Sequence, residues 1–302
     1  MRPPMSHTDP HRHSLAPFVA IAVSIAFYSV MDGAMKFASL ALGAYSATFW
    51  RNALGAAIVL PMWLREGAHR PGWPQIKLHL MRGTVSAGVA TTFFYGLIRL
   101  PLAEAIAISF IAPLIALFLA ALLLKEKVGK QAIGASVLGL VGVLVIAVGR
   151  TGEANAHPEA SLGVAAVLVS ACLYAWNLVL QRQQALLSKP AEVALFQSLV
   201  AALVLSFAAP WLLVMPDAES WISLGVSALM AVIALMLGSW AYGRAETQAL
   251  VPFEYTAFLW AALFGWIAFG EKVTLPTVLG AVLIVAGCWI AAPRKRTEQT
   301  AL

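Results

Sequence analysis

Long apolar stretches separated by short polar segments dominate this chain. A helix needs about 20 mostly apolar residues to cross about 30 Å of hydrocarbon. Ten stretches meet that length, at 15–36, 44–63, 80–98, 101–124, 130–149, 161–182, 191–214, 221–243, 247–269 and 274–292. Prolines, glycines and charged residues mark the breaks between them, as at Lys189-Pro190. The pattern predicts an all-α integral membrane protein with ten transmembrane helices.

Composition supports this prediction and excludes other classes. Of the 302 residues, 61% are hydrophobic and 11% are charged, and the mean hydropathy is +0.82. A soluble domain carries about 25% charged residues. So little charge cannot cover a water-facing surface, which excludes a soluble enzyme, a disordered protein and a disulfide scaffold. Cys172 and Cys288 lie inside apolar stretches and are interpreted as packed thiols.

The basic residues flank the apolar stretches unequally, and this asymmetry predicts the orientation. With the N-terminus inside, 15 lysines and arginines fall on the inner side and four on the outer side, while Arg51 lies within a span. The inner set includes Arg82, and the outer set is Lys36, Arg99, Arg150 and Lys272. Because basic residues concentrate in cytoplasmic loops, both termini are expected in the cytoplasm. A distribution of this kind does not suggest a nucleic-acid partner.

Two halves of the chain align with one another. At a shift of 145 residues, Arg99 matches Arg244, the triplet at 126–128 (EKV) matches 271–273 (EKV), and Gly142 matches Gly287. A shift of 146 aligns Ser24 with Ser170 and Tyr28 with Tyr174. Each half has five spans, which is an odd number, so the second copy is inverted in the membrane relative to the first. We therefore expect a 5+5 inverted repeat, typical of secondary transporters. Its parts are a tail at 1–14, repeats at 15–149 and 161–292, a linker at 150–160 and a tail at 293–302.

The two halves end in similar sequences, and these resemble a known family. One ending is LPLAEAIAISFIAPLIALFLAALLLKEKVG (100–129), and the other is ETQALVPFEYTAFLWAALFGWIAFGEKVTLPTVLGAVLIVAG (246–287). Together with the two five-span halves they resemble the EamA-type carriers of the drug/metabolite transporter superfamily. The resemblance implies a polytopic inner-membrane carrier, often an exporter of amino acids or other small metabolites. The fourth span carries Ala112-Pro113 whereas the ninth has Ala257-Phe258, so a kink there would come from Pro252.

An ionisable residue at the hydrocarbon centre costs roughly 2.5–3.5 kcal/mol and so marks a candidate site; the candidates are Asp32, Arg51, Glu104 and Glu254. Glu254 lies about 10 Å deep by the helical rise, beside Pro252. The alternative is that Glu254 is a hydrogen-bonded carboxyl with a purely structural role. Asp32 can instead pair with Lys36 one turn away. Glu104 and Arg51 are candidates for coupling or gating. For Arg51 the sequence leaves Asp32, Glu104 and an anionic substrate group open as partners.

Polar residues form stripes on single helical faces. Ser170, Tyr174, Asn177 and Gln181 recur at spacings of four, three and four, and Ser24, Tyr28, Asp32 and Lys36 recur at four. Lipid cannot satisfy such groups, so the stripes must face protein or water. Helix packing through polar contacts is one reading. Because the two stripes are equivalent in the repeat, a shared polar cavity between the halves is favoured.

Aromatic residues complete the candidate site. Tyr95, Tyr174, Trp176, Tyr255 and Trp260 are predicted to border the cavity, where their rings suit stacking or a cation. The alternative is that the aromatic side chains only fill lipid-facing positions. Trp240 is assigned to gating. The substrate-binding set is therefore Tyr28, Asp32, Tyr95, Tyr174, Trp176, Asn177, Gln181, Glu254, Tyr255 and Trp260, and the coupling or gating set is Arg51, Glu104 and Trp240.

The motifs that are missing narrow the chemistry. The six histidines, at 7, 11, 13, 69, 79 and 157, are assigned to termini or loops, which argues against an intramembrane serine protease. No zinc motif, Walker motif or GxGxxG predicts a metal, a cofactor or direct ATP use. We expect a secondary transporter, an exporter of a small metabolite, with the proton as candidate coupling ion and a monomer or homodimer both open. The alternatives are a membrane enzyme using Glu104 and Glu254, and a channel.

Overall fold

The structure, a computed structural model, describes residues 15–68, 70–100, 102–109, 111–125, 128–150, 159–257, 259–260, 263, 267 and 275–291. Every regular element in these residues is a helix. Both predicted tails and most of the linker lie outside the described residues. The all-α expectation is confirmed for the part of the chain that the structure describes.

The first two predicted spans form one element. Helix α1 runs from Ala16 to Arg65, 50 residues, and covers both 15–36 and 44–63. The predicted loop between them is instead a kink at Gly43, with φ 77° and ψ 154°. Only glycine adopts that backbone geometry at little cost, so the chain can turn there between the two helical parts of α1.

The other predicted spans correspond to helices whose bounds differ from the predicted ones. The first half continues with α2 (Trp73–Leu97), α3 (Leu102–Ser109), α4 (Ile111–Leu119), the π-helix η2 (Ala120–Leu124) and α5 (Lys130–Arg150). The second half has α6 (Ala160–Leu187), α7 (Pro190–Ser206), α8 (Ala209–Leu212), α9 (Ala218–Tyr242), α10 (Thr247–Leu250), the 3-10 helix η3 (Val251–Tyr255) and α12 (Leu275–Ala291). The ninth span thus starts with two short pieces, and its tight turn contains Pro252.

Local sequence explains where two of the second-half helices begin. Pro190 opens α7, a position where its missing N–H leaves no hydrogen bond unmade. Asp217 caps α9 by accepting a hydrogen bond of 2.9 Å from the backbone N–H of Ser220. Hydrogen bonding from Ser220 also holds the pKa of the Asp217 carboxyl below its usual value.

Among the described residues, three helices are long and apolar enough to cross a membrane: Ala16–Arg65, Ser161–Leu187 and Ala218–Tyr242. Two shorter apolar helices span Ile111–Leu124 and Pro190–Ser206. Many large apolar side chains along these helices are exposed, including Phe118, Leu203 and Ile222. A soluble monomer rarely exposes apolar surface so widely, so these faces fit lipid contact. The full ten-span count stays a prediction.

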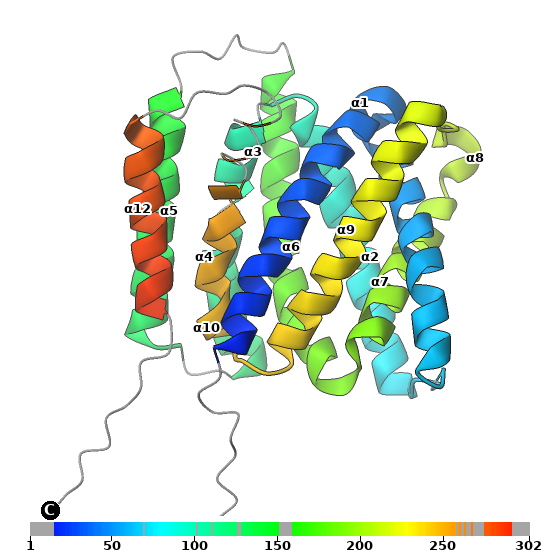
Figure 1. Ribbon diagram of the computed structural model, residues 1–302, viewed down its shortest axis with the longest axis horizontal. Coiled ribbons are helices and arrows are strands. Elements are labelled where there is room, and N and C mark those ends of the chain that lie inside the picture. The colour runs from blue at the N-terminus through cyan, green and yellow to red at the C-terminus, as the bar shows by residue number, and fades with distance from the viewer. Residues whose placement is uncertain are drawn as a thin grey trace, which may run out of the picture.

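The two halves of the chain interleave rather than stand apart. Helix α1 packs along α9 and α7, and α2 packs along α6 and α7, as the adjacent ribbons show (Figure 1). Helices α5 and α12 form a separate pair at one side of the bundle (Figure 1). There a Cβ on Gly287 would lie 2.9 Å from the Ala135 carbonyl oxygen, so glycine permits the close crossing. Helices from both halves therefore surround the interior that holds the candidate site.

Candidate functional site

A cavity of about 210 Å³ lies among helices of both halves. Its polar lining from the first half is Ser24, Tyr28, Ser29, Asp32, Arg51, Arg82, Ser86 and Ser109, and from the second half Ser170, Tyr174, Asn177, Gln181, Gln197, Tyr242 and Glu254. Apolar side chains such as Ile21, Phe93 and Phe94 fill the rest. Drug-sized ligands occupy pockets of about 300–1,000 Å³, so this cavity suits a smaller molecule.

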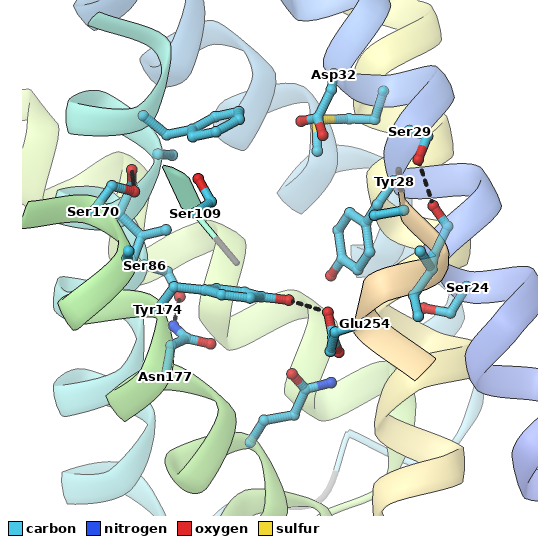
Figure 2. Close-up of a pocket in the computed structure, with 18 of the residues that line it drawn as sticks. Ser24, Tyr28, Ser29, Asp32, Ser86, Ser109, Ser170, Tyr174, Asn177 and Glu254 are labelled. Carbon is cyan, nitrogen blue, oxygen red and sulfur yellow. Dashed lines mark hydrogen bonds between the residues drawn. The ribbon is translucent and has the colours of Figure 1, made fainter. Parts of the chain in front are cut away.

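Both predicted polar stripes line this one cavity, except for Lys36. The repeat-equivalent tyrosines Tyr28 and Tyr174 enter it from α1 and α6, and Figure 2 shows their rings extending into the same space. The equivalent serines mainly bond to neighbouring backbone: Ser24 Oγ donates to the Ala234 carbonyl at 2.7 Å, and Ser170 Oγ to the Val89 carbonyl at 2.9 Å. The stripes thus combine helix-packing contacts with cavity-facing groups, and both readings offered by the sequence hold in part.

Glu254 is held at the cavity by two tyrosine hydroxyls. Tyr174 Oη donates to Glu254 Oε2 at 2.8 Å (Figure 2), and Tyr242 Oη donates to Oε1 at 3.4 Å. The residue is 8% exposed and belongs to η3, the tight segment that contains Pro252. Within the part of the chain that the structure describes, this carboxyl contacts two phenols and forms no ion pair, so it can hold or release a proton without breaking one.

Asp32 lies on α1 in another part of the cavity, and Tyr28 lies between it and Glu254 (Figure 2). Arg51, from the later part of the same helix, is the charged residue whose electrostatic field acts on Asp32. The Arg51 guanidinium donates to Met31 Sδ at 3.3 Å and lies 5.8 Å from the Phe94 ring centroid. Of the two side chains predicted as partners of Arg51, the structure describes that of Asp32, whereas the side chain of Glu104 lies outside the described residues.

Arg82 is a cavity residue that the sequence reasoning missed. It was counted as a cytoplasmic charge, yet it is 1% exposed on α2 and lines the cavity. Its Nε donates to Asn177 Oδ1 at 3.4 Å and its Nη1 donates to Gln184 Oε1 at 2.5 Å. Asn177 Nδ2 in turn donates to Ser86 Oγ at 2.5 Å. Arg82 shares one face of α2 with the cavity residues Ser86, Val89 and Phe93, and this spacing is the signal in the sequence that could have placed it at the cavity.

His79 corrects a second expectation. It lies in α2 rather than a loop, is 1% exposed, and stacks on Phe196 with ring centroids 4.5 Å apart. Its Nε2 lies 3.0 Å from Glu192 Oε1, and its Nδ1 contacts Gln184 Nε2. Ser188 Oγ donates to the same Glu192 oxygen at 2.6 Å. A polar network therefore runs from the start of α7 to Arg82. The sequence assigns His79 to a loop because a single polar residue at the edge of an apolar stretch cannot be distinguished from a loop residue by hydropathy.

Five predicted aromatic residues do not line the cavity. Tyr95 and Trp176 are each 38% exposed. Trp176 follows Tyr174 by two residues, which turns it about 200° around the helix and away from the cavity. The Arg99 guanidinium stacks on Tyr95 at 3.6 Å and pairs with Glu159 at 2.7 Å.

The other three aromatics serve packing. Tyr255 is fully buried against α5, where a Cβ on Gly139 would lie 2.5 Å from its ring. Trp260 packs against the apolar cluster beside α1, and Trp240 holds Arg244 over its ring at 4.1 Å. The structure therefore places Tyr28, Asp32, Tyr174, Asn177, Gln181, Glu254 and Arg51 together at the cavity, and these five aromatics outside it.

Buried ionisable groups around a polar cavity, within a bundle whose outer faces are apolar, define the class: a membrane transport protein. The EamA-like transporter family model matches residues 15–148 and 161–292, and the chain belongs to this family of transporters, which are not enzymes. The two matched segments correspond to the two halves that align in the sequence.

Relatives with named functions cover nearly the whole chain. A riboflavin transporter of Brucella anthropi is 25% identical over 285 residues, covering 91% of this chain and 98% of its own. A pseudopaline exporter of Pseudomonas aeruginosa is 26% identical, covering 89% and 94%, and an S-adenosylmethionine uptake transporter of Rickettsia prowazekii is 24% identical, covering 87% of each. A solved crystal structure shares the fold, with a TM-score of 0.75 at 21% identity, covering 92% and 96%. The relatives carry different compounds in different directions, so they support a transporter without naming a substrate.

Proposed function

We propose that this protein is a secondary transporter that exports a small polar or amphipathic metabolite, such as an amino acid or an amine-bearing compound. It works by alternating access between two inverted five-helix halves of the inner membrane, with both termini in the cytoplasm and no use of ATP. The observation that carries the proposal is the shared cavity, in which the equivalent tyrosines Tyr28 and Tyr174 flank the carboxyls of Asp32 and Glu254.

The lining suits a substrate with hydrogen-bond donors and a positive group. Asp32 and Glu254 offer carboxyl oxygens, and aromatic rings beside them suit a cation. Gln197 Oε1 is buried without a hydrogen-bond partner in the described residues, and this side chain also lines the cavity. An unpaired buried acceptor costs free energy that a donor on a substrate would recover. Export as the direction rests on likeness to the Pseudomonas exporter.

The test is counterflow in proteoliposomes loaded with unlabelled compound, with labelled amino acids and primary amines outside, with and without a pH gradient. A carrier exchanges external labelled compound for internal unlabelled compound and so accumulates the label transiently, whereas a channel only lets the labelled compound equilibrate. We expect exchange of at least one compound, and net accumulation of that compound inside inside-out membrane vesicles, in which the export direction is inward. No exchange by any amino acid or amine would overturn the proposed substrate class.

Glu254→Gln tests the site within the same assay. This variant keeps the side-chain volume but removes the ionisable proton, and a hydrogen bond to a charged group is worth roughly 10- to 150-fold in an equilibrium constant. We expect exchange to fall at least about tenfold, at normal expression level. Glu159→Gln is the matched control, because Glu159 is exposed and pairs with Arg99 far from the cavity. Equal, undiminished rates in both variants would make Glu254 structural.

A further inference from the structure

Arg82 is oriented by amides and not neutralised by a carboxylate. Its two hydrogen bonds go to the side-chain oxygens of Asn177 and Gln184, both on α6. No ion pair of Arg82 occurs among the residues that the structure describes; the pairs found there are His79–Glu192 and Arg99–Glu159. Amide oxygens fix the plane of the guanidinium but leave its full positive charge in place.

The nearest carboxylate in this network already has its partners. Glu192 Oε1 accepts from Ser188 Oγ at 2.6 Å and lies 3.0 Å from His79 Nε2. Gln184 Nε2 can only donate, so His79 Nδ1 is the acceptor of that contact and His79 Nε2–H is the donor to Glu192. Every group between Glu192 and Arg82 is thus satisfied without moving the carboxylate toward the guanidinium.

The guanidinium has donors to spare, and it lines the cavity. An arginine carries five N–H donors, and the two bonds above use one on Nε and one on Nη1. The side chain is nevertheless 1% exposed, so water outside the protein does not solvate it. The hydroxyls of Tyr28, Tyr174 and Tyr242 are close enough for its charge to act on them. A buried charge without a counter-ion is destabilising, and a partner at the cavity would relieve it.

We propose that Arg82 is the binding site for a carboxylate of the transported molecule, with Asn177 and Gln184 as the residues that position it. Guanidinium and carboxylate match as a planar, two-bond pair. This deepens the proposed function and rests on it: a substrate with an ammonium toward Asp32 or Glu254 and a carboxylate at Arg82 is a zwitterion. Amines that lack an anionic group would leave Arg82 uncompensated and are poor substrates.

The anion site is tested with simple probes that do not require the substrate. Purified full-length protein in nanodiscs is heated in sodium acetate, sodium methyl phosphate or sodium chloride at constant ionic strength, and the unfolding midpoint is followed. Acetate should raise the midpoint of the wild type in a saturable way, more than methyl phosphate and unlike chloride. A linear response shared by all salts would overturn the proposal, since that is a general salt effect.

Matched variants assign the effect to Arg82. In Arg82→Gln the half-saturating acetate concentration should rise roughly 10- to 150-fold, while Arg99→Gln, an arginine outside the cavity, keeps the wild-type value. Arg82→Lys keeps the positive charge but loses the planar guanidinium, so its half-saturating acetate concentration should lie between those of the wild type and Arg82→Gln. Asn177→Asp places a carboxylate against Arg82 and should abolish the acetate response while raising stability without acetate. The Asn177→Asp variant still tests the site if Arg82→Gln does not fold. A full acetate response in Arg82→Gln or Asn177→Asp refutes the site.

Counterflow separates this inference from the proposed function. The compounds are L-phenylalanine, its methyl ester and phenethylamine, which differ mainly in the carboxylate. We expect exchange of the amino acid, little exchange of the other two, and loss of that preference in Arg82→Lys. Equal exchange of all three by the wild type overturns the carboxylate site and leaves the transporter intact. A saturable acetate effect without exchange of any amino acid or amine upholds the anion site and overturns the proposed substrate class.

Discussion

Gly96→Ala should loosen the crossing of α2 and α6, the helices that carry Arg82, Ser86, Tyr174 and Asn177. A Cβ at position 96 would lie 2.4 Å from Val167 Cγ2 and 2.8 Å from the Gly163 carbonyl oxygen. Carbon atoms in contact are normally about 3.5–4.0 Å apart, so the overlap exceeds about 1 Å. Val167 is fully buried and β-branched, with one preferred helical rotamer, so its side chain cannot turn aside. The helix axes must therefore separate.

The magnitude follows from two opposing effects. Overpacking costs about 1–3 kcal/mol, and a clash with backbone belongs at the upper end. Alanine is better than glycine inside a helix by about 1 kcal/mol. Gly96→Ala should thus lower the free energy of unfolding by about 2 kcal/mol. Gly225→Ala in α9 is the matched control, because nothing lies within 4 Å of its Cβ position. It should be neutral or up to about 1 kcal/mol more stable.

The assay is equilibrium unfolding in mixed micelles with increasing sodium dodecyl sulfate, read by tryptophan fluorescence, for wild type and both variants. The predicted order of stability is Gly225→Ala, then wild type, then Gly96→Ala, with about 3 kcal/mol between the extremes. If Gly96→Ala is as stable as Gly225→Ala, α2 and α6 do not cross as closely as these contact distances require, and the argument fails.

Three further predictions address the cavity and the topology. Tyr174→Phe removes the hydroxyl that bonds Glu254 and should slow counterflow several-fold, whereas Tyr95→Phe should not; equal rates for both would exclude a role of that hydroxyl. Tyr28→Cys and Asn177→Cys, in a chain lacking Cys172 and Cys288, should react with a water-soluble thiol reagent and be protected by substrate, while Trp176→Cys should react only with a lipid-soluble reagent; unreactive cavity positions would reduce the stripes to packing contacts. Reporter fusions at Gly152 and Arg294 should read outside and inside respectively, and the reverse at either point refutes the orientation.

Periodicity in the sequence was enough to place the core of the site. Ser170, Tyr174, Asn177 and Gln181 share one helical face that lipid cannot satisfy, and the repeat equivalence of the two stripes predicts that this face meets the α1 stripe. All four line the cavity together with Tyr28. The same rule, applied to Trp176, would have turned it outward. It was misplaced because its residue type was weighed above its angular position.

Hydropathy windows could not place residues at the ends of spans. Arg82 and His79 lie at the start of the third predicted stretch, where a charge or an imidazole counts as loop. Their burial depends on Asn177, Gln184 and Glu192, which are supplied by α6 and α7 from the other half of the chain. Contacts so distant in sequence leave no local pattern that identifies these partners, although Arg82 shares a helical face with the cavity residues Ser86, Val89 and Phe93. The kink at Gly43 was missed for a related reason, since a loop and a bent helix have the same composition.

The amide clamp on Arg82 also sets an order of events during synthesis. Asn177 and Gln184 follow Arg82 by 95 and 102 residues. At about 5–20 residues per second, the ribosome needs roughly 5–20 s to supply them. For that interval the nascent α2 carries a guanidinium without its amide partners. The first half therefore cannot complete this clamp on its own, and α6 must be made before Arg82 has the hydrogen bonds described above.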